Sequence, residues 1–208
     1  MGVARDERRL LVELLGEVGP DAPTLCSPWT TRDLTAHLVI RERRFDAAPG
    51  IVLKPFAGYT QRVQDGYAKK TWGDLLDELR SGPPFWSPYS VGVVDELANT
   101  AEFFVHHEDV RRAQEGWEPR PPDAKRDRAL WRGLPHAARL NYRNSPVGIV
   151  LRRPDGEQVT VKRGANGVVI TGEPGELLLH AFGRDEVRVE FAGEADAVSA
   201  VRAMSRGI

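Results

Sequence analysis

Residues 93–114 read VVDELANTAEFFVHHEDVRRAQ, and this stretch decides the fold of the first half of the chain. Its small and apolar residues recur at helical spacing, and Gly116 follows as a stop signal, so we expect one long helix. Glu102, His106 and Asp109 share the alanine-rich stripe of that helix. Residues four apart lie one turn apart on the same face, so Glu102 and His106 are expected to point at one place.

A second helix is expected to supply a partner for this pair. It begins near Thr30, because Thr30 and Asp33 stand three apart like the two members of a capping box. His37 follows on the apolar face of this helix, between Leu34 and Leu38. Two ligands from one helix need a third ligand from elsewhere to hold a metal ion, and a histidine on a core-facing stripe can supply it.

His37, Glu102 and His106 together predict a site for one divalent metal ion. A charged glutamate buried without a partner costs several kcal/mol, and a cation removes that cost. Two imidazoles and a carboxylate are ligands of zinc, and a set of three leaves a coordination position open, as in catalytic sites. Nickel, iron and manganese also suit such a set. The alternative is that Glu102 and His106 form only a surface pair; the core-facing His37 favours the metal.

Other residues near these ligands have candidate roles. Asp109 is a candidate catalytic base or a hydrogen-bond acceptor for an imidazole, the alternative being a solvated acid at the helix end. Arg41, one turn after His37, is a candidate for binding an anionic group of a substrate, although such an arginine often lies only at a rim. His107 points about 100° away from His106 and is the substitute ligand if the register differs. Cys26 is interpreted as a small, half-buried side chain.

The rest of the sequence predicts an α+β protein of two domains. Helical periodicity marks three further segments: residues 4–18, one or two helices within 58–82, and 123–142. Pro135 predicts a kink or a break in the last of these. We therefore expect a helical bundle over residues 1–145 and a small α/β domain over residues 146–208.

The C-terminal domain is expected to contain a small sheet. Residues 147–152 and 158–162 are β-rich and flank a turn at Pro154-Asp155-Gly156, which predicts a hairpin. The remaining predicted elements, in chain order, are strands at 168–171 and 187–191, with helices at 176–182 and 195–204.

Composition excludes several classes of function. The 29 basic and 30 acidic residues give a net charge of −1, which argues against a nucleic-acid partner, since phosphate binding needs a basic excess. No apolar run approaches the roughly 18–20 residues of a membrane helix, and the first residues contain no signal-peptide core. A single cysteine forms no intrachain disulfide and fits a reducing cytoplasm, where we expect the protein as a monomer or homodimer.

Two stretches resemble the mycothiol-dependent maleylpyruvate isomerase family. Residues 29–38, WTTRDLTAHL, resemble its tryptophan-to-histidine signature, and residues 102–109, EFFVHHED, are similar to its second metal motif. The resemblance implies a DinB-like four-helix bundle with a zinc ion on His37, Glu102 and His106.

The resemblance extends more loosely into the C-terminal domain. Residues 172–184 are similar to a helix of the family's small α/β domain, which implies that Arg184 faces the active site; the alternative is a plain helix-terminus cation. With the roles argued above from the residues themselves, the candidate catalytic residues are Asp109 and Arg184, and Arg41 is the candidate for binding the substrate.

The function implied by the resemblance is that of a zinc-dependent, mycothiol-using isomerase or thiol transferase. Mycothiol, the small thiol of actinobacteria, would be a cosubstrate whose sulfur takes the open metal position and attacks a small electrophilic substrate. Metal-assisted hydrolysis follows if bound water is the nucleophile instead. The alternative class is a non-catalytic metal- or thiol-binding stress protein.

Overall fold

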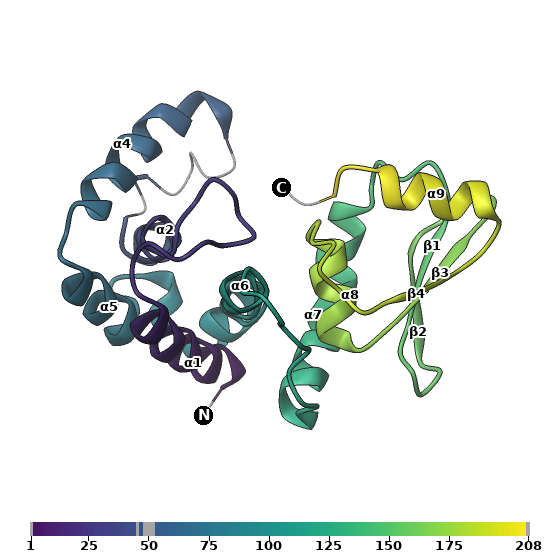
Figure 1. Ribbon diagram of the computed structural model, residues 1–208, viewed down its shortest axis with the longest axis horizontal. Coiled ribbons are helices and arrows are strands. Elements are labelled where there is room, and N and C mark those ends of the chain that lie inside the picture. Colours follow the sequence, from purple (N-terminus) through teal and green to yellow (C-terminus); the bar gives the residue numbers. More distant parts are fainter. Residues whose placement is uncertain (1, 45, 48–52, 207–208) are drawn as a thin grey trace. The chain divides into compact units, whose positions relative to one another are not determined.

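The structure is a computed structural model that describes residues 2–44, 46–47 and 53–206. The chain divides into two compact units, Met1–Glu118 and Pro119–Ile208, here called the N-terminal and C-terminal units. Helices make up the N-terminal unit, whereas the C-terminal unit combines helices with a sheet (Figure 1). The predicted α+β class, with a helical bundle first, is confirmed.

The N-terminal unit is a bundle in which α1 packs against α5 and α6, and α2 packs against α4 and α5. The elements are α1 (Val3–Val18), α2 (Thr31–Arg43), η1 (Lys54–Phe56), α4 (Ala57–Ala68), α5 (Trp72–Ser81), η2 (Pro88–Ser90) and α6 (Gly92–Arg112). The predicted capping box is present at the start of α2, where the Thr30 N–H donates to Asp33 Oδ2 at 3.0 Å. It satisfies backbone groups that the first turn of a helix leaves unpaired.

The core of this bundle holds the helices that carry the predicted ligands. Leu34 and Leu38 of α2 and Phe103 of α6 are buried in one apolar cluster with leucines of α1 and α5. Each such buried side chain contributes about 1.5–3 kcal/mol through the area it removes from water. Because Leu38 and Phe103 directly follow His37 and Glu102 in the sequence, packing of the core also sets where those two side chains lie.

The C-terminal unit contains α7 and a four-stranded sheet of order β2-β1-β3-β4. Its elements are α7 (Ala124–Asn141), β1 (Ile149–Arg152), β2 (Gln158–Lys162), β3 (Val168–Thr171), α8 (Pro174–Ala181), β4 (Glu190–Ala192) and α9 (Ala195–Ala203). Strands β1 and β2 form the predicted antiparallel hairpin, β1 and β3 are parallel, and β3 and β4 are antiparallel. Gly156 has φ 93° in the hairpin turn, a conformation that favours glycine.

The expectations for Pro135 and for the last strand can be compared with the structure in detail. Helix α7 continues through Pro135, so of the predicted kink or break the break is absent. Strand β4 begins at Glu190, not at residue 187, because the backbone N–H of Arg188 donates to Glu176 Oε2 at 2.6 Å instead of joining the sheet. The contacts divide the chain between residues 118 and 119 and group α7 with α8 and β2, whereas the domain division after residue 145 stays a prediction.

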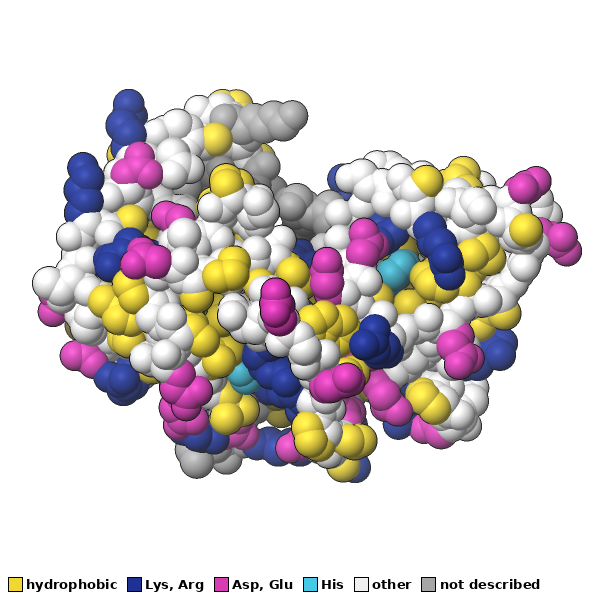
Figure 2. Space-filling view, in the orientation of Figure 1, with side chains coloured by type: hydrophobic (Ala, Val, Ile, Leu, Met, Phe, Trp, Pro, Cys, Tyr) yellow, Lys and Arg dark blue, Asp and Glu magenta, His cyan; other side chains and the backbone are white. Residues whose placement is uncertain are grey.

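Charged side chains of both signs are interspersed over the visible face of each unit (Figure 2), in keeping with the net charge of −1. Among the residues that the structure describes, no helix is both long enough and apolar enough to cross a membrane.

A buried tyrosine–histidine pair in the C-terminal unit predicts that stability depends on pH. Tyr142 Oη lies 2.5 Å from His180 Nδ1, and burial, together with the charges of Arg206 and Arg202, lowers the pKa of His180 to about 3. The unfolded chain takes up a proton near the ordinary histidine pKa of about 6.5, whereas the folded chain does not until far lower. This stabilisation is therefore complete above pH 6.5 or so and is lost as pH falls from about 6.5 towards 3, by up to about 1.4 kcal/mol per pH unit.

Urea unfolding at pH 7.5 and pH 5.5 measures this effect. We expect the free energy of unfolding to fall more steeply between the two pH values in the wild type than in His180→Gln, which has no imidazole to titrate. Equal falls in the two proteins would contradict the buried neutral histidine.

Candidate metal centre

The structure brings the three predicted ligands, His37, Glu102 and His106, together inside the N-terminal unit. His37 lies on α2 with only 7% of its surface exposed, and Glu102 and His106 lie one turn apart on α6. His37 Nε2 is 3.4 Å and His106 Nε2 is 3.5 Å from the same oxygen, Glu102 Oε1. One ligand atom from each of the three side chains lies within 4.8 Å of the others.

These separations suit a shared metal ion better than direct hydrogen bonds. Nitrogen and oxygen ligands about 2.0–2.1 Å from a tetrahedral zinc ion stand about 3.3 Å from each other. The observed 3.4 and 3.5 Å are close to that value and longer than a normal N–H···O hydrogen bond. The donor set and its spacing therefore fit a divalent ion, while occupancy and identity of the metal stay predictions.

The charges at this centre are coupled through Glu102. Burial alone would raise the pKa of Glu102, but the nearby imidazoles of His106 and His37 and the charge of Arg41 outweigh it, so its pKa lies well below the ordinary value. Burial lowers the pKa of His37. Burial also disfavours the charged form of His106, yet the hydrogen bond with Asp109 and the nearby Cys26 and Glu102 raise its pKa well above the usual value. A metal ion would therefore have to compete with a proton for His106.

Arg41, the predicted substrate-binding residue, lies beside the ligands. Its Nε is 3.4 Å from Glu102 Oε1, and its Nη1 donates to Asn99 Oδ1. The guanidinium carbon stands 4.8 Å from the centre of the Tyr89 ring, in a cation–π contact. Arg41 therefore partly neutralises Glu102 in this structure, and its role towards a substrate stays a prediction.

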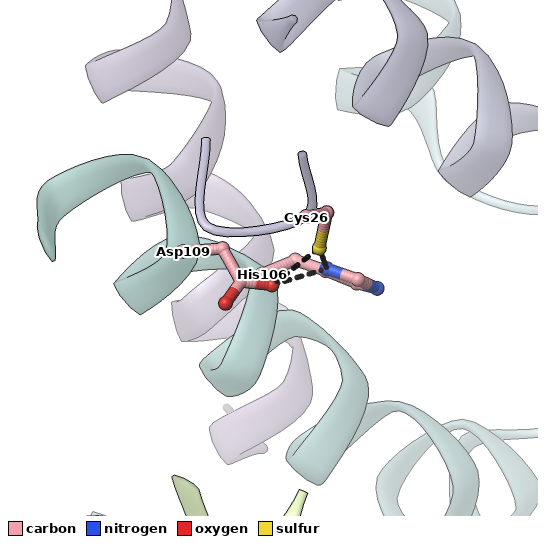
Figure 3. A group of neighbouring side chains, drawn as sticks. All are labelled: Cys26, His106 and Asp109. Atoms are coloured by element: carbon pink, nitrogen blue, oxygen red, sulfur yellow. Dashed lines mark hydrogen bonds and ion pairs between the residues drawn. The ribbon is translucent and has the colours of Figure 1, made fainter. Parts of the chain in front are cut away.

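Asp109 lies behind His106, on the side of the ring away from Glu102. Its Oδ2 is 2.9 Å from His106 Nδ1, and the residue has no exposed surface. The Cys26 thiol donates to the same Oδ2 at 3.0 Å (Figure 3). An imidazole that bonds a carboxylate through Nδ1–H presents its Nε2 lone pair to a metal. This geometry favours the interpretation of Asp109 as the partner that orients His106.

Cys26 is the neighbour that the sequence did not reveal. It stands 80 residues before His106, in the loop between α1 and α2, and no motif links the two positions. The only available signal was its position three residues before Trp29, where the tryptophan-to-histidine motif begins.

The two remaining candidate residues, His107 and Arg184, make other contacts within their own units. His107, the substitute ligand, is buried with its Nδ1 3.3 Å from Glu7 Oε2 of α1, and it belongs to neither group of side chains spaced to hold a metal among the described residues. Arg184 belongs to the C-terminal unit, where its Nη1 donates to the Phe182 carbonyl at 2.7 Å. Its catalytic role stays a prediction.

Comparison with known proteins bears on the fold. No protein-family model matches the chain, and the search of curated proteins found no match. Among solved structures, the crystal structure of the mycothiol-dependent maleylpyruvate isomerase matches with a TM-score of 0.59 and 14% identity, over 93% of this chain and 92% of that one. At this identity the match establishes a shared fold. The expected resemblance is thereby confirmed at the level of the fold: this chain folds like the mycothiol-dependent maleylpyruvate isomerase.

Proposed function

We propose that this protein binds one divalent metal ion, most simply zinc, through His37, Glu102 and His106, and that it is a mycothiol-dependent metalloenzyme. Its reaction would be an isomerisation or a thiol transfer on a small electrophilic substrate. The observation that carries the proposal is the carboxylate oxygen of Glu102 facing the Nε2 atoms of both histidines at 3.4 and 3.5 Å. The shared fold with an isomerase that depends on mycothiol supports the choice of thiol.

The metal would supply an open coordination position at which a thiol or water loses its proton near neutral pH. The chain's own residues prepare that position. His106 is held through Nδ1 by Asp109, and the ring of His37 packs against Trp29 with the centroids 5.1 Å apart. These contacts hold both imidazoles in place before any ligand binds. Binding therefore costs little side-chain conformational entropy.

Arg41 has two roles in this proposal. Its Nε at 3.4 Å from Glu102 Oε1 keeps that carboxylate charged and available to a cation. As a cation beside the open position, it would also attract an anionic group of the thiol or the substrate. Arg184 would supply a second cation from the C-terminal unit, as in the resemblance noted above.

A turnover assay tests this function. Metal-loaded protein is mixed with mycothiol and chlorodinitrobenzene, a chromogenic electrophile whose chloride is displaced by the thiol sulfur. We expect turnover that depends on the metal and falls to the uncatalysed rate in His106→Ala. Saturable mycothiol binding without turnover would contradict the enzyme and favour a non-catalytic metal- or thiol-binding protein. Failure of the purified protein to bind any divalent metal would overturn both the metalloenzyme and the non-catalytic metal-binding protein.

A further inference from the structure

The loop between α1 and α2 touches both histidines of the candidate metal centre. Trp29 packs on the ring of His37, and Cys26 lies at the back of His106. The loop is tied to α6 independently of these side chains, because the Leu25 N–H donates to the Asp109 carbonyl at 3.1 Å. Thr24 closes the loop internally, since its Oγ1 accepts from the Cys26 N–H at 3.2 Å. The backbone that carries Cys26 is therefore held next to α6 by contacts that do not involve its thiol.

The thiol of Cys26 meets a single carboxylate oxygen together with an imidazole. Its Sγ donates to Asp109 Oδ2 at 3.0 Å, and His106 Nδ1 lies 2.9 Å from that same oxygen. Sγ is 3.9 Å from His106 Nδ1 itself, so the thiol acts on the histidine mainly through Asp109. Figure 3 shows the other ring nitrogen of His106 pointing away from both partners.

These distances argue against a second metal ion between Cys26, His106 and Asp109, although one ligand atom of each lies within 4.8 Å of the others. Around a tetrahedral zinc ion, sulfur would stand about 3.5 Å from an oxygen ligand, and nitrogen about 3.3 Å from it. The observed 3.0 and 2.9 Å are hydrogen-bond distances. Cys26 also cannot reach an ion at Nε2, because the two nitrogens face opposite sides of the ring.

We propose that Cys26 is a positioning residue of the metal centre. Its thiol holds Oδ2 of Asp109 in place, and Asp109 in turn holds Nδ1–H of His106, so that Nε2 faces Glu102. The terminal torsion of an aspartate is broad, and a second donor on the same oxygen restricts it. Asp109 has no exposed surface, so bulk water does not replace the thiol as that donor. This inference rests on the proposed metal binding and adds a residue to it.

Zinc and cobalt(II) affinities of the wild type, Cys26→Ala and Cys26→Ser test the inference by competition with a chromogenic chelator. Cys26→Ala removes the donor to Asp109. We expect metal binding to be about threefold to tenfold weaker, because one modest hydrogen bond is lost. Cys26→Ser keeps a donor on the same atom position, and we expect affinity within about twofold of the wild type. Urea unfolding of each variant confirms that it is folded.

A double-mutant cycle separates positioning from a general loss of structure. Asp109→Asn alone is expected to weaken metal binding by about tenfold to a hundredfold. Adding Cys26→Ala to Asp109→Asn should then weaken it little further, because the thiol acts through the carboxylate.

The outcomes distinguish this inference from the proposed function. A wild type that binds no metal overturns the metal centre itself. A wild type that binds metal, with Cys26→Ala binding equally well or Cys26→Ser as weak as Cys26→Ala, overturns only the positioning role. An intense thiolate-to-cobalt charge-transfer band that disappears in Cys26→Ser would also overturn it, because Cys26 would then be a direct ligand.

Discussion

Substitution His106→Gln is expected to weaken binding of a divalent metal by on the order of a thousandfold, because it replaces one of three strong ligands by a neutral amide. His106 presents Nε2 3.5 Å from Glu102 Oε1, and no other histidine of α6 faces that oxygen within the described part of the chain. Competition titration with zinc and isothermal calorimetry with a weaker-binding metal measure the loss. Glutamine can still bond Asp109, so the bundle should remain folded.

His107→Gln is the matched control. The substitution is identical, the residue is next in the same helix, and His107 is also buried and bonded to a carboxylate, that of Glu7. We expect metal affinity within about threefold of the wild type, because its imidazole lies on another face of α6. Equal losses in His106→Gln and His107→Gln would mean that the effect comes from disturbing the helix and not from removing a ligand.

Glu102→Gln is expected to abolish the stabilisation of the protein by metal. Ligand that binds only the folded state at a thousand times its Kd raises the free energy of unfolding by about 4 kcal/mol. Glutamine has nearly the shape of glutamate but lacks the charge that offsets the metal, so the variant should gain almost nothing. Chemical unfolding of metal-free and metal-loaded protein, followed by tryptophan fluorescence, measures the difference.

In metal-free Glu102→Gln, the contacts of Arg41 are expected to change. In the wild type, Glu102 Oε1 lies 3.4 and 3.5 Å from the two imidazoles and is paired with Arg41. In Glu102→Gln, Arg41 loses this pairing but keeps its contacts to Asn99 and the Ala98 carbonyl. Glu115→Gln, at an exposed position just after α6, is the matched control and should keep the full metal response. A metal-dependent gain in Glu102→Gln equal to that of the wild type would show that this carboxylate is not a ligand.

Local sequence patterns were sufficient for most elements and named all three ligands of the candidate centre, but they placed only Glu102 and His106 relative to each other. The helical period of residues 93–114 placed Glu102 and His106 on one face, and the Thr30–Asp33 pair marked where α2 begins. Both features depend on contacts within one helical turn, which is the range over which a sequence pattern is decisive. The hairpin at Pro154–Gly156 was predictable for the same reason.

The start of strand β4 differs from the prediction because of a contact with a residue of another element. Residues 187–189 have β-rich composition, but the Arg188 N–H bonds the Glu176 side chain of α8, and the strand starts later. Pro135 was expected to kink or break its helix. The helix is not broken there, since loss of one backbone hydrogen bond is tolerable in a helix packed on α8 and β2.

The sequence by itself determined which face of α6 carries Glu102 and His106 and where α2 begins. It also determined that a helical bundle comes first and a sheet-containing part follows. Only the tertiary structure decided that His37, 65 residues before Glu102, meets it at 3.4 Å, and that Cys26, 83 residues before Asp109, shares that carboxylate with His106. The physical reason is separation along the sequence. Backbone hydrogen bonds and the helical period link residues a few positions apart, whereas residues 65 or 83 positions apart meet only through the packing of the whole apolar core.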